Sequence, residues 1–291
     1  GGGGCKCAVA ISSSLKSLIK GNMADVAFLL FLEPASEEEE AKQPRSTRLL
    51  DWAIKTFQET PPMMHCEILL TPRHSEQHLL HFATYIGRQS GWQLGKGANE
   101  AYYLRENAGR WRAVPVFATD ATKRIRHECE LERGVSYSLA KYVTSTYPFR
   151  SFARFIGSSR REPAHCATLT ARILKNALDS ESPVQKHYNY YSPSSLYNDA
   201  RDDVATKTSG WKTAMPETKT AELINKILRG AETSETIADL GDDGCGEAAR
   251  ALTLRVCSEM QGGDTASRSV AERQLATALL RWSVLRQGSD D

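Results

Sequence analysis

The sequence predicts an α+β fold: an antiparallel sheet with a cysteine-bearing helix packed on it, followed by a helical extension. Short apolar runs bounded by polar turns are typical of strands. The chain has several such runs in its first half, among them Val26–Leu32, Met64–Leu70 and a run from about His78 to Ile86. Apolar residues then recur at helical spacing behind Cys166, at Leu169, Ile173, Leu174 and Ala177.

Three segments of the chain differ in composition. We expect a leader at 1–22, an α+β domain at 23–205 and a helical extension at 206–291. The extension is poor in large apolar residues and rich in charge, so its helices are expected to pack on the domain or on another protein. Its apolar residues predict helices around 223–228, 248–257 and 270–285, separated by glycines at 241–246 and 262–263.

Local signals predict the remaining elements of the domain. Ser46 or Thr47 can cap a helix, and turn residues such as Asn107 and Gly109 favour a hairpin. The expected elements are a helix at 49–57, a hairpin of strands 102–105 and 111–117, a strand at 125–131, a helix through 139–143 and a capped helical turn at 191–197.

Composition excludes several classes of protein. The chain has 291 residues, of which 41% are hydrophobic and 25% charged, as in soluble globular proteins. The net charge of +2 is spread along the chain, so we expect no nucleic-acid partner. Seven cysteines without a CxxC pair argue against a disulfide framework or zinc module and favour a reducing compartment. No apolar run reaches the ~20 residues that a transmembrane helix needs.

Cofactor signals are missing as well. The chain has no phosphate loop, no HExxH motif and no Rossmann glycine pattern, so we expect no cofactor. His65 and Cys66 are adjacent in a predicted strand, and alternation places them on opposite faces. We therefore do not expect them to form a metal pair.

Cys166 is a candidate nucleophile. Pro163 suits the opening position of a helix, because its missing N–H would have no intrahelical partner there. A thiol in the first turn then meets free backbone N–H groups and the positive end of the helix dipole, and both favour the thiolate. The alternative is that Cys166 is a small buried core residue, as many free cysteines are.

Two histidines of the third predicted strand, His78 and His81, are candidates for the face of the sheet that carries His65. If the turn between the strands is centred near 73–74, the residue opposite His65 lies close to Phe82. His81 is then the nearest polar candidate. His78 and His81 are three positions apart, so they lie on opposite faces of the strand. A one-residue change of register would place His78 instead of His81 on the face that carries His65.

The leader resembles an acylation signal. If an initiator methionine was removed, Gly1 would be exposed, with Cys5 where myristoylation signals usually carry Ser or Thr. Cys5 and Cys7 could take palmitate as the second anchor that stable membrane attachment requires, and 8–20 could form an amphipathic helix beside them. Two other interpretations stay open: an artificial glycine leader, or a natural start at Met23.

The order of these parts resembles the circularly permuted papain-like fold. Its members include permuted NlpC/P60 proteins, the lecithin-retinol acyltransferase-like group and homologues in large DNA viruses. They run strand, helix, a strand opening with histidine, further antiparallel strands, and a helix headed by cysteine. The matching parts are Val26–Leu32, Leu49–Phe57, His65-Cys66-Glu67-Ile68-Leu69 and Ala164-His165-Cys166-Ala167, with Gly134–Ser138 and Ser192–Tyr197 as further signposts. The viral members are the most similar, because their histidine strand often reads His-Cys-Glu-Leu.

The resemblance covers about 24–205 and implies roles for single residues. Cys166 would be the nucleophile and His65 its base, with His81 or His78 orienting the imidazole. A thiolate would attack a carbonyl carbon, and backbone N–H groups at the helix start would hold the oxyanion. His165 departs from the Asn, Phe or small residue that many members have before the cysteine.

We therefore expect a cysteine-dependent hydrolase or acyltransferase that acts on a peptide, ester or lipid substrate. Two alternatives stay open: a virion structural or matrix protein that keeps the papain-like core as scaffold, and a lipid-anchored binding module. The dyad favours the first, whereas the leader and the tail fit the other two. The expected location is cytoplasmic, membrane-associated by acylation, or in a virion, with a protein partner for the C-terminal helices.

Overall fold

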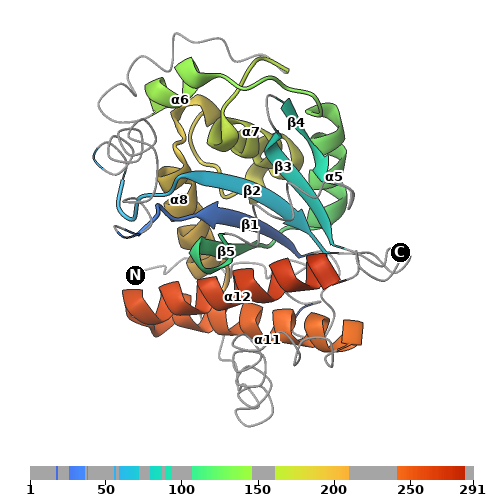
Figure 1. Ribbon diagram of the computed structural model, residues 1–291, viewed down its shortest axis with the longest axis vertical. Helices are drawn as coiled ribbons and strands as arrows, with labels where there is room; N and C mark the ends of the chain where they lie inside the picture. The colour runs from blue at the N-terminus through green and yellow to red at the C-terminus, as the bar shows by residue number, and fades with distance from the viewer. Residues whose placement is uncertain are drawn as a thin grey trace, which may run out of the picture.

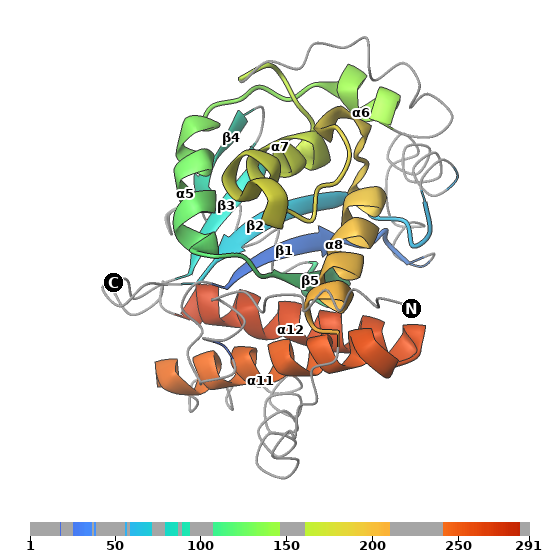
Figure 2. The same cartoon turned by 180° about the vertical axis from the view of Figure 1, so that it is seen from behind.

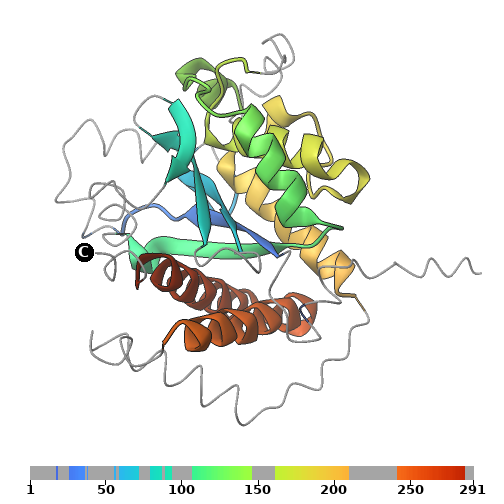
Figure 3. The same cartoon turned by 90° about the vertical axis from the view of Figure 1, so that its right-hand side faces the viewer.

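The computed structural model contains a five-stranded antiparallel sheet with helices on one face and along one edge (Figures 1 and 3). The α+β class predicted from the sequence is therefore confirmed. The structure describes residues 18, 26–36, 38, 56, 59–71, 79–86, 89–93, 107–145, 161–209 and 241–285. Several predictions fall outside these residues: Gly1, Cys5, Cys7 and His78, and the elements expected at 102–105 and 223–228 and over nearly all of 49–57.

The sheet has the strand order β4-β3-β2-β1-β5, and each neighbouring pair is antiparallel. Its strands are β1 (Ala27–Leu32), β2 (His65–Leu70), β3 (Leu80–Ile86), β4 (Gln89–Gln93) and β5 (Trp111–Val116). Every residue of β1 is buried, which explains why its sequence is apolar without alternation. The predicted strands β1 and β2 are confirmed to within one residue, whereas β4 was not predicted.

Helices α5, α7 and α8 lie on one side of the sheet, and the pair α11 and α12 runs below β5 (Figures 2 and 3). The α-helices are α5 (Ala121–Leu131), α6 (Leu139–Ser145), α7 (Cys166–Leu178), α8 (Pro193–Lys207), α11 (Gly241–Gly262) and α12 (Thr265–Leu285). The short 3₁₀ helices are η1 (Ala108–Arg110), η3 (Asp179–Glu181) and η4 (Tyr188–Tyr190).

The helix predicted behind Cys166 is α7, but it begins three residues later than Pro163 suggests. Ala164 forms a parallel bridge with Tyr137, and its N–H donates to the Ser136 carbonyl at 2.9 Å. This pairing keeps the backbone extended up to His165, which is the N-cap residue. Cys166 is therefore the first residue of α7, closer to the helix terminus than a start at Pro163 would allow.

The segment 134–138 and the start of α8 hold the chain just before the two candidate residues. Ser138 N–H donates to the Ala164 carbonyl at 2.9 Å, so 134–138 fixes the approach to Cys166. At the start of α8, Ser192 forms a capping box that stabilises the first turn. The neighbouring Ser194 hydroxyl accepts from Met63 N–H at 2.8 Å, two residues before His65.

Two local predictions were wrong. The segment expected to be a strand at 125–131 lies in α5, whose buried residues include Ala121, Ile125 and Cys129. These residues are four apart, which is helical spacing, and the exposed residues between them, Lys123 and His127, are polar. The glycines at 241–246 lie within α11 instead of ending a helix before it. The break predicted at 262–263 is confirmed.

The register of β2 and β3 also differs from the prediction. Ile68, not His65, is the residue opposite Phe82, and Leu69 is opposite His81. The pairing is symmetric about position 75 instead of 73–74, which shifts β3 by three residues. Because Leu69 and His65 have the same parity, His81 lies on the same face of the sheet as His65.

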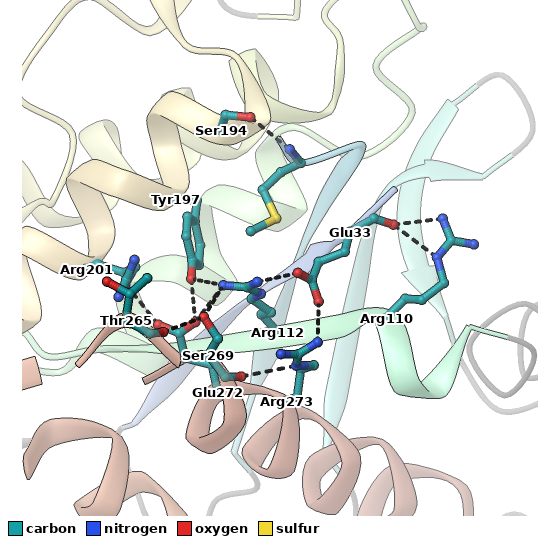
Figure 4. A network of polar contacts seen from close by, with 11 residues as sticks. Glu33, Arg110, Arg112, Ser194, Tyr197, Arg201, Thr265, Ser269, Glu272 and Arg273 are labelled. Carbon is teal, nitrogen blue, oxygen red and sulfur yellow. Dashed lines mark hydrogen bonds and ion pairs between the residues drawn. The ribbon is translucent and has the colours of Figure 1, made fainter. Parts of the chain in front are cut away.

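The C-terminal helices dock on the domain through a buried polar network (Figure 4). Arg112 of β5 donates to the Tyr197 hydroxyl of α8 at 2.8 Å and to Ser269 of α12 at 2.9 Å. Glu272 of α12 accepts from Tyr197 and lies 3.0 Å from the Arg201 Nε. The helices thus cover strand β5, the edge of the sheet, as the prediction of packing on the domain requires.

Candidate functional site

Cys166 and His65 meet where the start of α7 lies beside the start of β2. The two side chains are close enough for each to shift the pKa of the other, although 100 residues lie between them in the sequence. Cys166 is almost completely buried, with 2% of its surface exposed. The His65 side chain is 16% exposed and is the more open of the two. The structure thus brings together the two residues that the sequence analysis proposed as nucleophile and base.

Glu67 is the partner that orients His65. His65 Nε2 lies 2.9 Å from Oε1 of Glu67, which leaves Nδ1 as the ring nitrogen available to the Cys166 sulfur. The other carboxylate oxygen of Glu67 hydrogen-bonds His81. His81, which the sequence analysis favoured for the orienting role, therefore connects to His65 through Glu67. In order, the contacts run Cys166–His65–Glu67–His81.

The sequence analysis overlooked Glu67, although a signal was available. In a strand, residues two apart lie on the same face, so Glu67 had to lie beside His65. Glu67 is also an acid inside the otherwise apolar run that ends at Leu70. A carboxylate that is 3% exposed needs a hydrogen-bonded or charged partner, and the two histidines are that partner.

The site favours a charged thiolate–imidazolium pair. The hydrogen bond from Cys66 is the strongest influence on Cys166, and with the charge of His65 it outweighs burial and lowers the pKa of Cys166 well below the usual range. Burial lowers the pKa of His65, but the negative charge of Cys166 and the hydrogen bond to Glu67 outweigh burial and raise this pKa to about 10. Burial raises the pKa of Glu67, but His81 and His65 lower it to about 2.

A second thiol and a second histidine also contact Cys166. Cys66 donates its S–H to the Thr170 hydroxyl at 3.6 Å, one turn further along α7, and its side chain interacts with that of Cys166. Strand alternation separates His65 from Cys66, yet both contact Cys166, since they are the first two residues of β2. His165, the residue before Cys166, is fully buried, and its ring meets Tyr142 edge-on.

The start of α7 offers backbone donors for an oxyanion. The first N–H groups of a helix have no intrahelical partner. The N-cap residue, His165, forms no side-chain cap hydrogen bond that would occupy one of them. The N–H groups next to Cys166 therefore point to where negative charge would develop on a carbonyl attacked by its sulfur.

The described residues contain no cluster of three or more His, Cys, Asp or Glu arranged to hold a metal ion. Among the same residues, no helix has both the length and the apolar character to cross a bilayer.

Comparison with protein-family models, with curated proteins and with solved structures found no match to this chain.

Proposed function

We propose that the protein is a cysteine-dependent hydrolase or acyltransferase of the permuted papain-like class. The observation that carries the proposal is the series in which Cys166 interacts with His65 and His65 is hydrogen-bonded to Glu67 at 2.9 Å. It combines a nucleophile of lowered pKa, a base in contact with it and a carboxylate that orients the base. The order of elements adds support, because a histidine opens β2 and a cysteine opens α7.

The residues present can complete acyl transfer without a cofactor. The Cys166 thiolate attacks the carbonyl carbon, and N–H groups at the start of α7 stabilise the oxyanion. The imidazolium of His65 donates its proton to the leaving group as the carbon–heteroatom bond breaks, which leaves an acyl-thioester on Cys166. Neutral His65 then deprotonates water or an acceptor alcohol or amine, which attacks the thioester and releases Cys166.

An activated ester provides a test that does not require the natural substrate. With p-nitrophenyl acetate we expect a burst of nitrophenolate of one equivalent per protein, and peptide mass spectrometry should find the acetyl group on Cys166. Cys166→Ala should abolish the burst. Cys129→Ala is the matched control, because Cys129 is also buried but its pKa is raised by burial and by Glu130.

One observation favours a second candidate, a structural protein such as a virion component that keeps this core as scaffold. Cys166 is 2% exposed, so a substrate carbonyl must enter beside the more open His65. A scaffold protein would show no acetylated Cys166 and no difference between Cys166→Ala and Cys129→Ala. That outcome would reject the enzymatic proposal.

A further inference from the structure

Cys66 is a second thiol in direct contact with the proposed nucleophile. It is fully buried, donates its S–H to the Thr170 hydroxyl at 3.6 Å, and interacts with the Cys166 side chain. Thr170 follows Cys166 by one helical turn, and residues four apart lie on the same face of a helix. Cys66 therefore faces the side of α7 that carries Cys166. Both residues are free cysteines.

The surroundings of the two sulfurs would allow them to bond. Cys66 is fixed within the sheet, where it pairs with Phe31 of β1. Cys166, by contrast, is the first residue of α7, and its own N–H has no intrahelical partner. A small shift of this first turn towards β2 would break few backbone hydrogen bonds. A disulfide requires Cβ atoms roughly 3.5–4.5 Å apart, and this shift is the movement that would bring the two residues to that separation.

We propose that Cys66 is a resolving thiol: a hydroperoxide oxidises Cys166, and Cys66 then captures it as a reversible Cys66–Cys166 disulfide that switches the nucleophile off. The inference rests on the proposed function, because it requires Cys166 to be the reactive thiolate.

The two steps balance as follows. The Cys166 thiolate attacks one oxygen of hydrogen peroxide, an S–O bond forms, and the O–O bond breaks. The leaving hydroxide takes the proton of the His65 imidazolium and departs as water. Cys66 then attacks the sulfenic sulfur of Cys166, an S–S bond forms and the S–O bond breaks. Its thiol proton joins the leaving hydroxide as a second water, so two electrons pass from the two thiols to the peroxide.

Cys166 differs from the other cysteines that the structure describes. Burial raises the pKa of Cys129 and of Cys257, so both stay as unreactive thiols. Only a small oxidant fits a sulfur as buried as Cys166, and a sulfenic acid formed there would meet Cys66 before a second oxidant molecule. The pair should therefore form a disulfide instead of a sulfinic acid.

The experiment uses the reduced full chain, treated with about one equivalent of hydrogen peroxide, then alkylated with iodoacetamide and digested without reductant. We expect a disulfide-linked pair of peptides carrying Cys66 and Cys166, and dithiothreitol should restore alkylation of Cys166. In Cys66→Ser, Cys166 should proceed to sulfinic acid, with about tenfold less alkylation recovered by dithiothreitol. Cys129→Ser should behave as the wild type does.

Two negative outcomes have different meanings. If Cys166 of the untreated protein is alkylated no faster than Cys129, the proposed function fails and the inference fails with it. If Cys166 is alkylated rapidly but peroxide yields no linked peptides in the wild type, only the disulfide inference is overturned. The wild-type peptide map decides this even if Cys66→Ser folds poorly.

Discussion

Two clusters of buried charge lie in different parts of the sheet, and their chemistry differs. We call the first the site cluster; it consists of His65, Glu67, His81 and Cys166. We call the second the docking cluster (Figure 4); it consists of Glu33, Arg112, Arg201, Glu272 and Arg273. Both hold carboxylates close to cations. Only the site cluster contains a thiol and imidazoles.

The carboxylates Glu67 and Glu272 show that burial alone does not determine the pKa of a carboxylate. They are 3% and 0% exposed. Burial raises the pKa of both, but at Glu67 the two histidines overcome it and lower the pKa to about 2. At Glu272 the burial effect prevails over Arg201 and Tyr197, and the pKa stays raised. A buried charge is therefore no sign of catalysis by itself. The thiol and imidazole beside Glu67 are what distinguish the site cluster.

The largest effect is expected from breaking the docking cluster. Arg112→Met removes a buried charge and leaves Glu33 and Glu272 without it, which should lower the free energy of unfolding by about 3–5 kcal/mol. Urea denaturation measures the change. Arg124→Met is the matched control, because the Arg124–Glu181 pair is one-third exposed on each side and should contribute no more than about 1 kcal/mol.

The same variant tests whether the two clusters are independent. Under native conditions the alkylation rate of Cys166 in Arg112→Met should stay within about twofold of wild type, since the two clusters share no hydrogen bond or ion pair among the described contacts. A tenfold change in that rate would show that docking of α12 controls the site, and the two clusters would then not be independent.

The second-largest expected effect is on the pH dependence of Cys166 alkylation, which involves the site cluster alone. The lowered pKa of Cys166 keeps its thiolate in place as pH falls, and His65 stays protonated up to about pH 10. Between pH 8.5 and 6, iodoacetamide should therefore alkylate wild-type Cys166 at a nearly constant rate. In His65→Gln the thiol should return towards an ordinary pKa, and its rate should fall about a hundredfold over the same range. Parallel pH profiles for the two proteins would contradict the ion pair.

Much of the fold could be predicted because single segments carried strong signals. The apolar run of β1 and the stripe behind Cys166 depend on short-range periodicity alone. The segment at 125–131 was wrongly predicted to be a strand. Ile125 and Cys129 are four residues apart, and over so short a stretch this spacing fits both the period of a strand and that of a helix. Register could not be predicted either, because the β2–β3 pairing depends on where the chain turns between the strands.

Part of the site was also predictable from signals within single segments. Cys166 was identified from the start of its helix and His65 through the resemblance, and their contact follows from the way α7 packs against β2. Glu67 follows from strand parity but was passed over in favour of a histidine. The contact of Cys66 with Cys166 was not predictable, because alternation placed Cys66 on the face opposite His65 and the meeting of α7 with the end of β2 is a tertiary feature.

The smallest effect separates Glu67 from His81 as the orienting residue. Glu67→Gln keeps the shape but removes the charge that supports the His65 imidazolium, so the pKa of Cys166 should rise by about one unit. The pH at which the alkylation rate falls to half its maximum should then move up by about one unit. His81→Gln is the matched control, one hydrogen bond further from the thiol, and it should move that pH by about half a unit at most.

The pH dependence of stability provides a second test of the Glu67→Gln variant. The folded-state pKa of Glu67, about 2, lies below its ordinary 4.5, so Glu67 stabilises the fold above pH 4.5 and loses this effect as pH falls towards 2. Urea midpoints between pH 6 and 3 should therefore decline less steeply in Glu67→Gln than in wild type. If Glu67→Gln alkylates at the wild-type rate while His81→Gln is slow, His81 orients His65 and the series Cys166–His65–Glu67 is wrong. If both variants alkylate normally, the imidazole needs no orienting partner, and the pKa of Cys166 depends on Cys66 and His65 alone.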